Sequence, residues 1–468
     1  MSTIDPALSK LEQALGSGRV LTDAEVLASY AVDESEVPPH PPQAVVRVRE
    51  ASEVAATMRI CAEHGVPVTP RAGGTGRTGG AVPMAGGVVL AFEQMNRIKG
   101  IEEDDMIVVL EPGVITGELH RAVEAQGLFY PPDPNSLASC TLGGNVAENA
   151  GGPRALRYGS TRDYVLGLRV VTADGTQLSV GKRTVKGVTG YDLTSLLVGS
   201  EGTLAITTEI TLKLLPKPQA IATMLVFLPD LPAAGRAVTR VLRAGLLPRC
   251  LELLDDATLA IVRPEASMPI PESARAMLLI ELDGDEIALE GQLERAGAAV
   301  TDAGATDVLV ARHSGERDKL WAARRELSRA LRKRARFKLA EDVVVPRSKI
   351  PQLIDACRRI SERHKVHMPS YGHAGDGNIH VNFLWNDPGE EPAVHRAIEA
   401  MFKEVLALGG TLTGEHGIGV LKAPYLPLEQ SAELIALQER VKDLFDPKHV
   451  LNPGKIFPAH LKLFHGAC

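Results

Sequence analysis

Cysteine is scarce in this sequence and widely scattered. Only five cysteines occur among 468 residues. No Cys-x-x-Cys pair is present, and the spacing does not resemble the ladder of thiolates that holds an iron-sulfur cluster. The pattern argues against a cluster bound by this chain alone, and it is typical of reduced thiols in a cytoplasmic protein.

Long apolar runs and an excess of positive charge are also missing. No segment approaches the ~20 uninterrupted apolar residues of a membrane span, and the first residues show no basic stretch followed by an apolar core. The formal net charge is -7, so no global field attracts nucleic acid. We expect a cytoplasmic protein, at most peripheral at the inner membrane, with no transmembrane segment and no nucleic-acid partner.

One cluster of basic residues departs from this acidic balance. It lies between Arg324 and Lys338, in a stretch (316–338) whose pattern predicts one long helix. A solvated helix face would explain the cluster, and so would an anionic substrate or partner.

The length and a hydrophobic content of 44% predict two or three domains with sizeable cores. From residue 44 onward, helical and strand patterns alternate, with strands predicted at 44–48, 66–69, 88–92, 107–111, 166–172 and 277–282. The sequence LLPKP at 214–218 cannot continue a strand. It predicts a domain boundary near residue 217.

Glycine is concentrated in a run that follows one of these strands. The segment R-A-G-G-T-G-R-T-G-G at 71–80 contains Gly-x-Gly-x-x-Gly, with Glu93 near the offset of a ribose-binding acid. A dinucleotide fingerprint must open a helix, however, and here Pro83, Gly86 and Gly87 precede another strand. The Walker pattern also fails, because no Gly-Lys-Ser/Thr closes the loop. The run predicts backbone amides that surround phosphate oxygens, or else a structural glycine turn.

Further motifs follow in order along the chain. They are E-P-G at 111–113, P-P-D-P-N-S at 131–136, T-L-G-G-N-V-A-E-N-A-G-G at 141–152, G-S-E-G-T-L at 199–204, G-H-A-G-D-G-N-I-H at 372–380, G-E-H-G-I-G at 414–419 and L-N-P-G-K at 451–455. With the glycine run, they resemble the vanillyl-alcohol oxidase superfamily, in the branch of glycolate oxidase and the D-2-hydroxyacid dehydrogenases. The resemblance covers about residues 44 to 457. It departs from the common pattern at Ala72 and Ala205, where glycine is usual.

This resemblance implies an α+β protein of two parts. Residues 1–217 would form a PCMH-type FAD-binding domain of two subdomains with a helical N-terminal extension. Residues 218–468 would form an α/β substrate or cap domain of the FAD-linked oxidase C-terminal type, whose last segment returns to the flavin. No histidine stands beside Thr75, where covalently flavinylated relatives carry one, so the FAD should be noncovalent. The cofactor-binding residues implied by the motifs are Arg71, Gly73, Gly74, Thr75, Gly76, Thr78, Gly79, Gly80, Pro132, Asp133, Ser136, Thr141, Gly143, Gly144, Asn145, Ala147, Asn149, Gly152, Glu201, Gly202, Ile206 and Asn452.

Two histidines in the C-terminal half are candidate metal ligands. His373 and His380 flank Gly-Asp-Gly-Asn, and in a strand Asn382 would point to the same face as His380. Two imidazoles and one carboxylate leave open positions on Zn²⁺ or a similar divalent ion, as a catalytic metal requires. Glu415 is the candidate third ligand, although a structural histidine pair is the simpler alternative. The family resemblance favours metal binding by these residues.

Four further residues suggest substrate chemistry. His416 could accept the hydroxyl proton of a 2-hydroxy acid, since an imidazole titrates near neutral pH. The segment W-A-A-R-R-E-L-S at 321–328 resembles the part of D-2-hydroxyglutarate dehydrogenases that anchors the substrate carboxylate. It implies a clamp by Arg324, with Ser328 one turn later on the same helix face and Lys338 as a second cation. For Arg324 the alternative is a surface ion pair, and for His416 a structural histidine.

The resemblance implies an FAD-linked dehydrogenase or oxidase that converts a D-2-hydroxy acid (D-lactate, glycolate or D-2-hydroxyglutarate) to its 2-oxo acid. Hydride would pass to flavin N5 with help from a divalent metal, zinc by preference. Electrons would leave to a quinone, an electron-transfer flavoprotein, an iron-sulfur subunit or oxygen, and a homodimer is compatible with the resemblance. Two rivals stay open: an enzyme like alkyl-dihydroxyacetonephosphate synthase, and a non-catalytic electron-transfer subunit.

Overall fold

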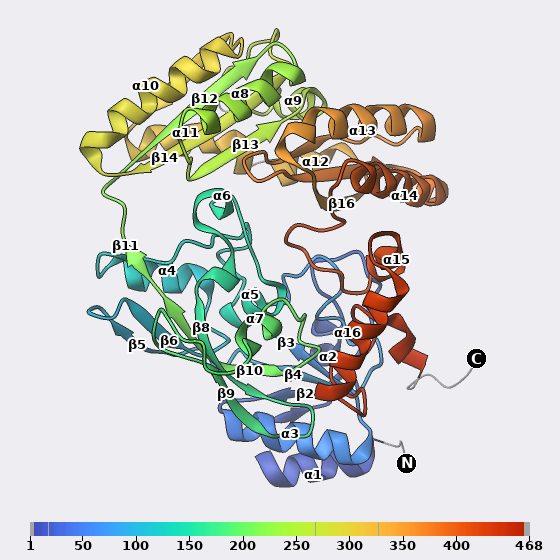
Figure 1. The fold of residues 1–468 in the computed structure, drawn as a ribbon. Helices are drawn as coiled ribbons and strands as arrows, with labels where there is room; N and C mark the ends of the chain where they lie inside the picture. The colour runs from blue at the N-terminus through green and yellow to red at the C-terminus, as the bar shows by residue number, and fades with distance from the viewer. Residues whose placement is uncertain (1–3, 17, 267, 326, 463–468) are drawn as a thin grey trace. The chain divides into compact units, whose positions relative to one another are not determined.

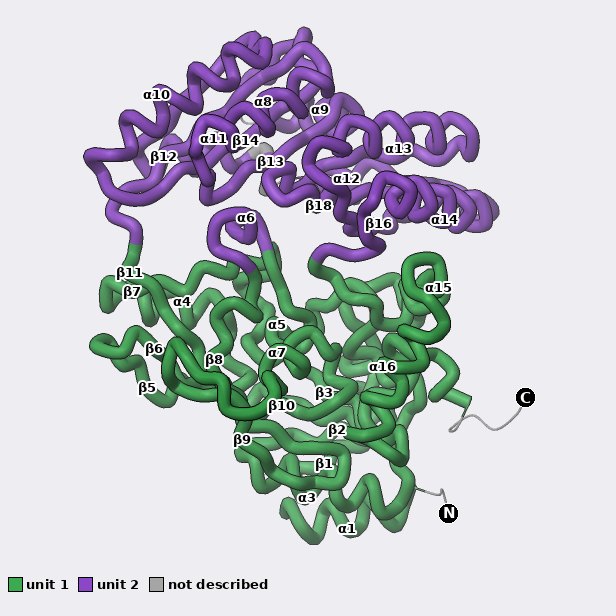
Figure 2. Tube along the Cα trace, in the orientation of Figure 1, with its two compact units in different colours: residues 1–151, 160–217, 415–468 green, residues 152–159, 218–414 purple. Residues whose placement is uncertain are grey.

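A computed structural model describes residues 4–16, 18–266, 268–325 and 327–462; the side chains of Ala323, Arg325 and Ser328 lie outside it as well. The chain forms two compact units, coloured separately in Figure 2. The first comprises residues 1–151, 160–217 and 415–468, and the second comprises 152–159 and 218–414.

These units depart at two places from a single division at residue 217. Residues 152–159 fold with the second unit, where Arg157 lies 3.1 Å from a carboxylate oxygen of Asp283 and the Tyr158 hydroxyl donates to the same side chain over 2.8 Å. Residues 415–468 fold with the first unit, where Leu451 forms a parallel bridge with Val68.

The first unit contains a small sheet covered by helices (Figure 1). Its strands, in order, are β1 (Val20–Leu21), β2 (Ala44–Arg47), β4 (Val88–Ala91) and β3 (Val68–Arg71), and its helices include α1 (Asp5–Leu15), α2 (Ala24–Ser29) and α3 (Ala51–His64). In α3, Val54, Met58 and Cys61 are buried on one face, and Gly65 ends the helix in the left-handed conformation at φ 64°. Only glycine adopts that conformation without a Cβ penalty, which accounts for the end of the helix at this residue.

A five-stranded antiparallel sheet forms the other part of this unit. Its strands, in order, are β5 (Ile98–Glu102), β6 (Ile107–Leu110), β10 (Ile206–Lys213), β8 (Val165–Val171) and β9 (Gln177–Gly181). Strand β10 alternates buried and half-buried side chains along its length, so one face lines the core. The remaining elements of the unit are α4 (Thr116–Glu124), α5 (Leu142–Glu148), α7 (Leu193–Leu197), α15 (Leu426–Glu429), α16 (Ala432–Phe445) and the pair β7 (Leu128–Phe129) and β11 (Leu215–Pro216).

The second unit is built on one seven-stranded antiparallel sheet. Its strands, in order, are β15 (Asp307–Ala311), β12 (Ala220–Leu228), β14 (Ala276–Gly284), β13 (Cys250–Leu254), β17 (Ser370–His373), β18 (Asn378–Trp385) and β16 (Phe337–Val344). Its helices are α6 (Ala155–Tyr158), α8 (Leu231–Arg243), α9 (Asp256–Val262), α10 (Glu286–Asp302), α11 (Ser314–Arg325), α12 (Leu327–Arg334), α13 (Ile350–His364) and α14 (Glu391–Ala407). Together the two units give the α+β class expected from the sequence.

The two faces of this sheet are covered by different helices. Helices α9, α11 and α12 pack their leucines against one face, around Leu279 of β14 and Tyr371 of β17. Helices α8, α10, α13 and α14 pack together and against β12, β14 and β16. The side chains that the sequence singles out for chemistry lie on the first of these faces, as the strand register shows below.

The predicted single helix over 316–338 is wrong at its end. Helix α12 stops at Arg334, and Phe337 begins β16, which pairs with β18 along its whole length. The alternating residue pattern of F-K-L-A-E-D-V-V favours a strand. Together with the backbone pairing to β18, it outweighs the helical pattern of the preceding basic residues. Lys338 therefore lies in a strand.

Two expectations from the sequence concern membrane-spanning segments and the cysteines. No helix among them is long and apolar enough to cross a membrane. The four cysteines that the structure describes, Cys61, Cys140, Cys250 and Cys357, are buried and form no disulfide with one another.

Candidate functional site

Strand β3 delivers the glycine run into a loop without regular structure. Residues 72–87 contain neither helix nor strand, as the prolines and glycines predict. The Arg71 guanidinium donates to the carbonyl of Val32 over 2.5 Å and folds across Gly74, where a Cβ would lie 2.3 Å from it. Gly74 has φ 65°, a left-handed conformation that disfavours a side chain, and a Cβ there would displace the Arg71 guanidinium. Burial lowers the pKa of Arg71.

The glycine run lies against the segment that begins α5. A Cβ at Gly73 would meet the Ser139 carbonyl oxygen at 2.7 Å, and a Cβ at Gly144 would lie 3.5 Å from Ala72. Gly143 is equally constrained, because its Cβ would come within 2.6 Å of Pro112. Two motifs far apart in the sequence thus meet backbone to backbone, which allows close approach to a phosphate-bearing ligand.

Two further motifs join the same cluster. A Cβ at Gly202 would lie 2.9 Å from Pro70, at the end of β3. The Asn452 carboxamide donates to the carbonyls of Gly80, over 3.2 Å, and Glu201, over 2.8 Å. Asn452 therefore ties the glycine run to the G-S-E-G turn.

The carboxylate of Glu201 holds the loop that follows His416. Its oxygens accept the backbone N–H groups of Ile418 over 2.7 Å and Gly419 over 2.6 Å. From the other side, the Thr78 hydroxyl donates to the His416 carbonyl over 3.1 Å. The side chains of Thr78 and Glu201 thus fix the backbone of this loop, and their expected contact with the cofactor stays a prediction.

Buried ionisable groups surround this loop. Burial, and next the neighbouring Glu201, raise the pKa of Glu148 well above its usual value. Burial lowers the pKa of Lys455 to about 7, although Asp33 and Glu201 oppose the shift. Sequence analysis did not single out Glu148 or Lys455 for chemistry, although both stand inside quoted motifs.

This cluster suits a polar cofactor. Three buried oxygens have no hydrogen-bond partner among the described residues: Thr141 Oγ1, Glu148 Oε2 and Asn452 Oδ1. Buried polar atoms in native proteins are nearly always satisfied, so unsatisfied ones in a cluster indicate a bound group. The glycines that permit close backbone approach lie around them.

Several residues implied by the motifs make other contacts in the structure, and their expected roles toward the cofactor stay predictions. Asn149 accepts hydrogen bonds from Ser160 and Arg162, and Ile206 belongs to the hydrophobic core. The Asn145 carboxamide donates to Thr116 Oγ1 over 2.8 Å. Gly152 falls in the second unit. The other expected contacts, at Pro132, Asp133, Ser136 and Ala147, stay predictions.

In the second unit, the strand register collects the polar candidates on one face of the sheet. Directly opposed residues of antiparallel strands share a face, as do residues two apart in one strand. Glu252 of β13 opposes His373, and Asp342 of β16 opposes His380. By the same register, Asn382 and Lys338 share this face. Asn382 Oδ1 has no hydrogen-bond partner among the described residues.

Glu252 connects the candidate metal ligand to the candidate substrate clamp. One carboxylate oxygen lies 2.5 Å from His373 Nδ1, and the other accepts from Arg324 Nε over 2.7 Å. Burial would raise the pKa of Glu252, but His373 and Arg324 outweigh it and lower that pKa to about 2. Arg324 is itself buried and lies over the Tyr371 ring, 4.8 Å from its centroid. The surface ion pair considered for Arg324 is therefore excluded.

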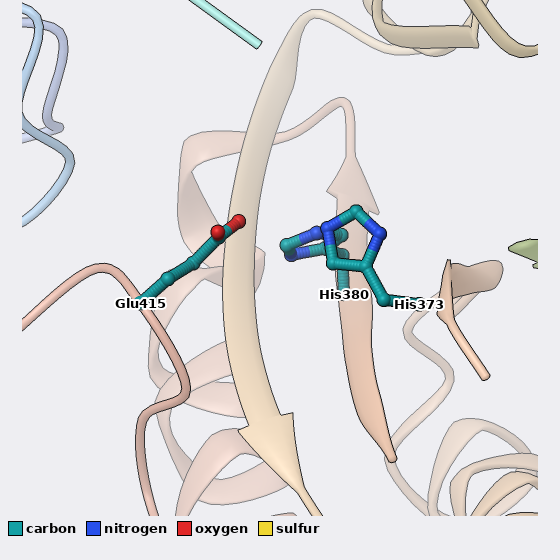
Figure 3. A group of neighbouring side chains, drawn as sticks. All are labelled: His373, His380 and Glu415. Atoms are coloured by element: carbon teal, nitrogen blue, oxygen red, sulfur yellow. The ribbon is translucent and has the colours of Figure 1, made fainter. Parts of the chain in front are cut away.

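His373, His380 and Glu415 lie together (Figure 3). Each offers one ligand atom, and these atoms lie within 4.8 Å of one another. The two histidine rings meet edge to face at 5.2 Å between centroids. Glu415 is the residue at which the chain leaves the second unit, and the N–H of the preceding Gly414 donates to Asp342 over 2.7 Å. Two imidazoles and a carboxylate form a suitable donor set for a divalent ion.

Two other candidates are placed less fully. The Ser328 side chain lies outside the described residues, and α11 and α12 are separate elements, so its shared face with Arg324 stays a prediction. The role of His416 as base also stays a prediction. The loop that carries it turns at Gly417, which has φ 80° as expected for a tight loop.

The first unit has the features of an α+β protein that binds a phosphate-bearing cofactor through backbone loops, and the second carries the two histidines of a candidate metal centre. Residues 42–181 match the family model described as "FAD binding domain", and residues 217–456 match "FAD linked oxidases, C-terminal domain". The chain belongs to the family of FAD-linked oxidases.

Relatives cover nearly the whole chain. It is 42% identical over 430 residues to a glycolate oxidase subunit GlcD of Bacillus subtilis (strain 168), which covers 92% of each protein. It is 35% identical over 464 residues to a D-lactate dehydrogenase of Anaerostipes hadrus, covering 97% of this chain and 98% of the relative. These relatives agree with the branch that the motifs resemble.

Solved structures share the fold at low identity. One of p-cresol methylhydroxylase matches with a TM-score of 0.82 and 16% identity, covering 97% of each chain. One of alkyldihydroxyacetonephosphate synthase matches with a TM-score of 0.75 and 17% identity, covering 96% of this chain and 84% of the other. At this identity the likeness concerns the fold alone.

Proposed function

We propose that this protein is an FAD-dependent dehydrogenase that oxidises a D-2-hydroxy acid to the 2-oxo acid. The observation that carries the proposal is the grouping of His373, His380 and Glu415, with Arg324 joined to His373 through Glu252. D-lactate, glycolate and D-2-hydroxyglutarate are the candidate substrates. The relatives named glycolate oxidase subunit and D-lactate dehydrogenase support this substrate class.

The residues of the first unit would hold the cofactor. The backbone amides of residues 73–80 and 143–145 suit the pyrophosphate, because glycines remove the side chains that would block approach. When bound, FAD supplies the hydride acceptor for the oxidation. Thr78 and Glu201 hold the His416 loop from the same region of the unit.

The residues of the second unit would bind the substrate. A guanidinium suits a carboxylate in paired hydrogen bonds, and Arg324 is held in place by Glu252 and the Tyr371 ring. His373, His380 and Glu415 would hold a divalent ion, zinc by preference, and that ion would supply a Lewis acid near the hydroxyl. Asn382 is buried on the same sheet face and offers its carboxamide oxygen.

His416 would take the hydroxyl proton on a ring nitrogen. Its position in the chain, directly after Glu415, and the clamps on its backbone by Thr78 and Glu201 favour a fixed orientation. Loss of a general base typically costs a factor of about 10² to 10⁴ in rate. We expect His416→Ala to lower kcat by that factor and to leave FAD content unchanged. Full turnover by the variant would show that another group accepts the proton.

A panel of 2-hydroxy acids tests the activity itself. The purified protein with FAD should reduce a dye acceptor with D-lactate, glycolate or D-2-hydroxyglutarate, and the L-enantiomers of lactate and 2-hydroxyglutarate should react more slowly. Chelation should abolish turnover, and readdition of Zn²⁺ or Co²⁺ should restore it. No dye reduction with any 2-hydroxy acid would contradict the proposed activity, and turnover unaffected by chelation would contradict the metal role alone.

The electron acceptor is a separate proposal. A quinone, an electron-transfer flavoprotein or an iron-sulfur subunit would reoxidise the flavin, since the cysteines of this chain offer no cluster of their own. Comparing reoxidation rates with a soluble quinone and with oxygen distinguishes a dehydrogenase from an oxidase.

A further inference from the structure

We propose that Glu252 is a positioning residue for both halves of the substrate site: it sets which nitrogen of His373 faces the metal, and it holds Arg324 at a fixed place beside that histidine. The inference rests on the proposed metal and substrate site. It assigns a role to a residue that no sequence motif marks.

The contact between Glu252 and His373 is set by the sheet. The two residues are directly opposed in the ladder between β13 and β17, so their separation depends on strand register rather than on flexible side chains. The side chains of Glu252, His373 and Arg324 are 0%, 4% and 7% exposed. A buried contact of this kind excludes water as a substitute partner for the carboxylate.

The chemistry of the contact selects the tautomer of His373. A carboxylate only accepts hydrogen bonds, so the imidazole nitrogen 2.5 Å from it, Nδ1, carries the hydrogen. The neutral ring then has its lone pair on Nε2, which is the nitrogen available to a metal. Metal-bound histidines commonly have such a carboxylate partner, and its removal typically costs a factor of about 10 to 100 in metal affinity.

The second oxygen of Glu252 fixes the substrate clamp. It accepts from Arg324 Nε over 2.7 Å, and a guanidinium held in place suits a substrate carboxylate in paired hydrogen bonds. Tyr371, two residues before His373, supports the same guanidinium from its ring face. One carboxylate therefore sets the spacing between the clamp and the metal ligand. A carboxamide in its place can accept from only one of the two partners.

The test is Glu252→Gln in the FAD-loaded protein, with Co²⁺ affinity as the first readout. The absorption of bound Co²⁺, in competition with a chelator, reports affinity without any turnover. We expect E252Q to bind Co²⁺ about 10- to 100-fold more weakly. In turnover assays, the KM for the 2-hydroxy acid should rise as well, because the Arg324 guanidinium loses its anchor.

Glu281→Gln is the matched control. Glu281 is a buried glutamate on the neighbouring strand β14, where it pairs with Arg249 at 3.1 Å and accepts from Trp321, without contact to His373. Co²⁺ affinity within threefold of wild type in E281Q, together with the loss in E252Q, supports the inference. An equal loss in both variants, or none in E252Q, overturns it.

Two further variants keep the outcomes separate. If wild type binds Co²⁺ no better than His373→Ala, the proposed metal site fails, and the role of Glu252 fails with it. If wild type binds and H373A does not, but E252Q matches wild type, only the inference fails. Should E252Q not fold, Glu252→Asp decides, because its shorter side chain cannot span both partners: wild-type Co²⁺ affinity and KM in E252D overturn the inference.

Discussion

Asp255, directly after β13, illustrates how burial changes the chemistry of one side chain. It caps α9 by accepting the N–H of Thr258 over 2.8 Å, and it also accepts the N–H of Ser370. Burial raises its pKa to about 6, even though both hydrogen bonds favour the charged form. Between about pH 4 and pH 6, the folded protein thus keeps a proton that the unfolded chain has lost.

The sign of the pH effect follows from this difference. Because the folded-state pKa is the higher one, the contribution of Asp255 to stability falls as pH rises through this window, by at most about 1.4 kcal/mol per pH unit. Asp255→Asn keeps a cap acceptor and removes the titration. The free energy of unfolding of both proteins is measured with urea from about pH 4 to 7. The difference in favour of the variant should grow up to about pH 6 and stay constant above it. A difference independent of pH would contradict the assignment.

Residue by residue, the sequence marks the candidate metal ligands but not the side chains that hold them in place. His373, His380 and Glu415 stand in glycine-rich motifs, and they do lie together. Glu252 stands in the apolar strand C-L-E-L-L, and its partners are 121 and 72 residues away along the chain. Only the strand order that places β13 beside β17 brings them into contact, and no local pattern encodes that order.

At the scale of elements, local sequence patterns predicted the strands and helices that local interactions determine. The predicted apolar strands were confirmed, whereas the predicted helix over 316–338 extended too far. Its last residues belong to β16, whose pairing partner β18 lies about forty residues further along the chain. Long-range pairing of this kind overrides local helix propensity.

Helix α16 shows that a single buried ion pair can anchor an element. Lys442 is its only buried residue, and its ammonium group donates to Asp446 over 2.5 Å, to Thr203 and to Leu451. Lys442→Met would leave the Asp446 carboxylate buried without its cation. We expect a loss of about 3 to 5 kcal/mol in the free energy of unfolding, measured by chemical denaturation.

A second lysine with the same spacing provides the control. Lys403 and Glu399 of α14 also lie four residues apart, at 2.6 Å, but both are exposed. Lys403→Met should cost about 0.5 kcal/mol or less. Equal losses in the two variants would mean that burial does not determine the strength of the Lys442 pair.

For the whole molecule, the attachment of FAD is the property most directly testable. No histidine stands beside Thr75, so acid or heat denaturation should release all of the flavin into the supernatant. Added FAD should also raise the midpoint of thermal unfolding, because a ligand that binds only the folded state stabilises it by about 2.7 kcal/mol at a hundred times its Kd. Flavin that stays with the precipitated chain would indicate a covalent bond.

The first unit is assembled from three separate stretches of chain, and the stretch from residue 415 onward is the last of the three to be synthesised. Val68 bridges Leu451, and Asn452 joins Gly80 to Glu201. At ribosomal rates of about 5 to 20 residues per second, the interval between the emergence of these partners is on the order of tens of seconds. During that interval the glycine loop lacks the support of Leu451 and Asn452, so a nascent chain should acquire its cofactor only after these two residues have emerged from the ribosome.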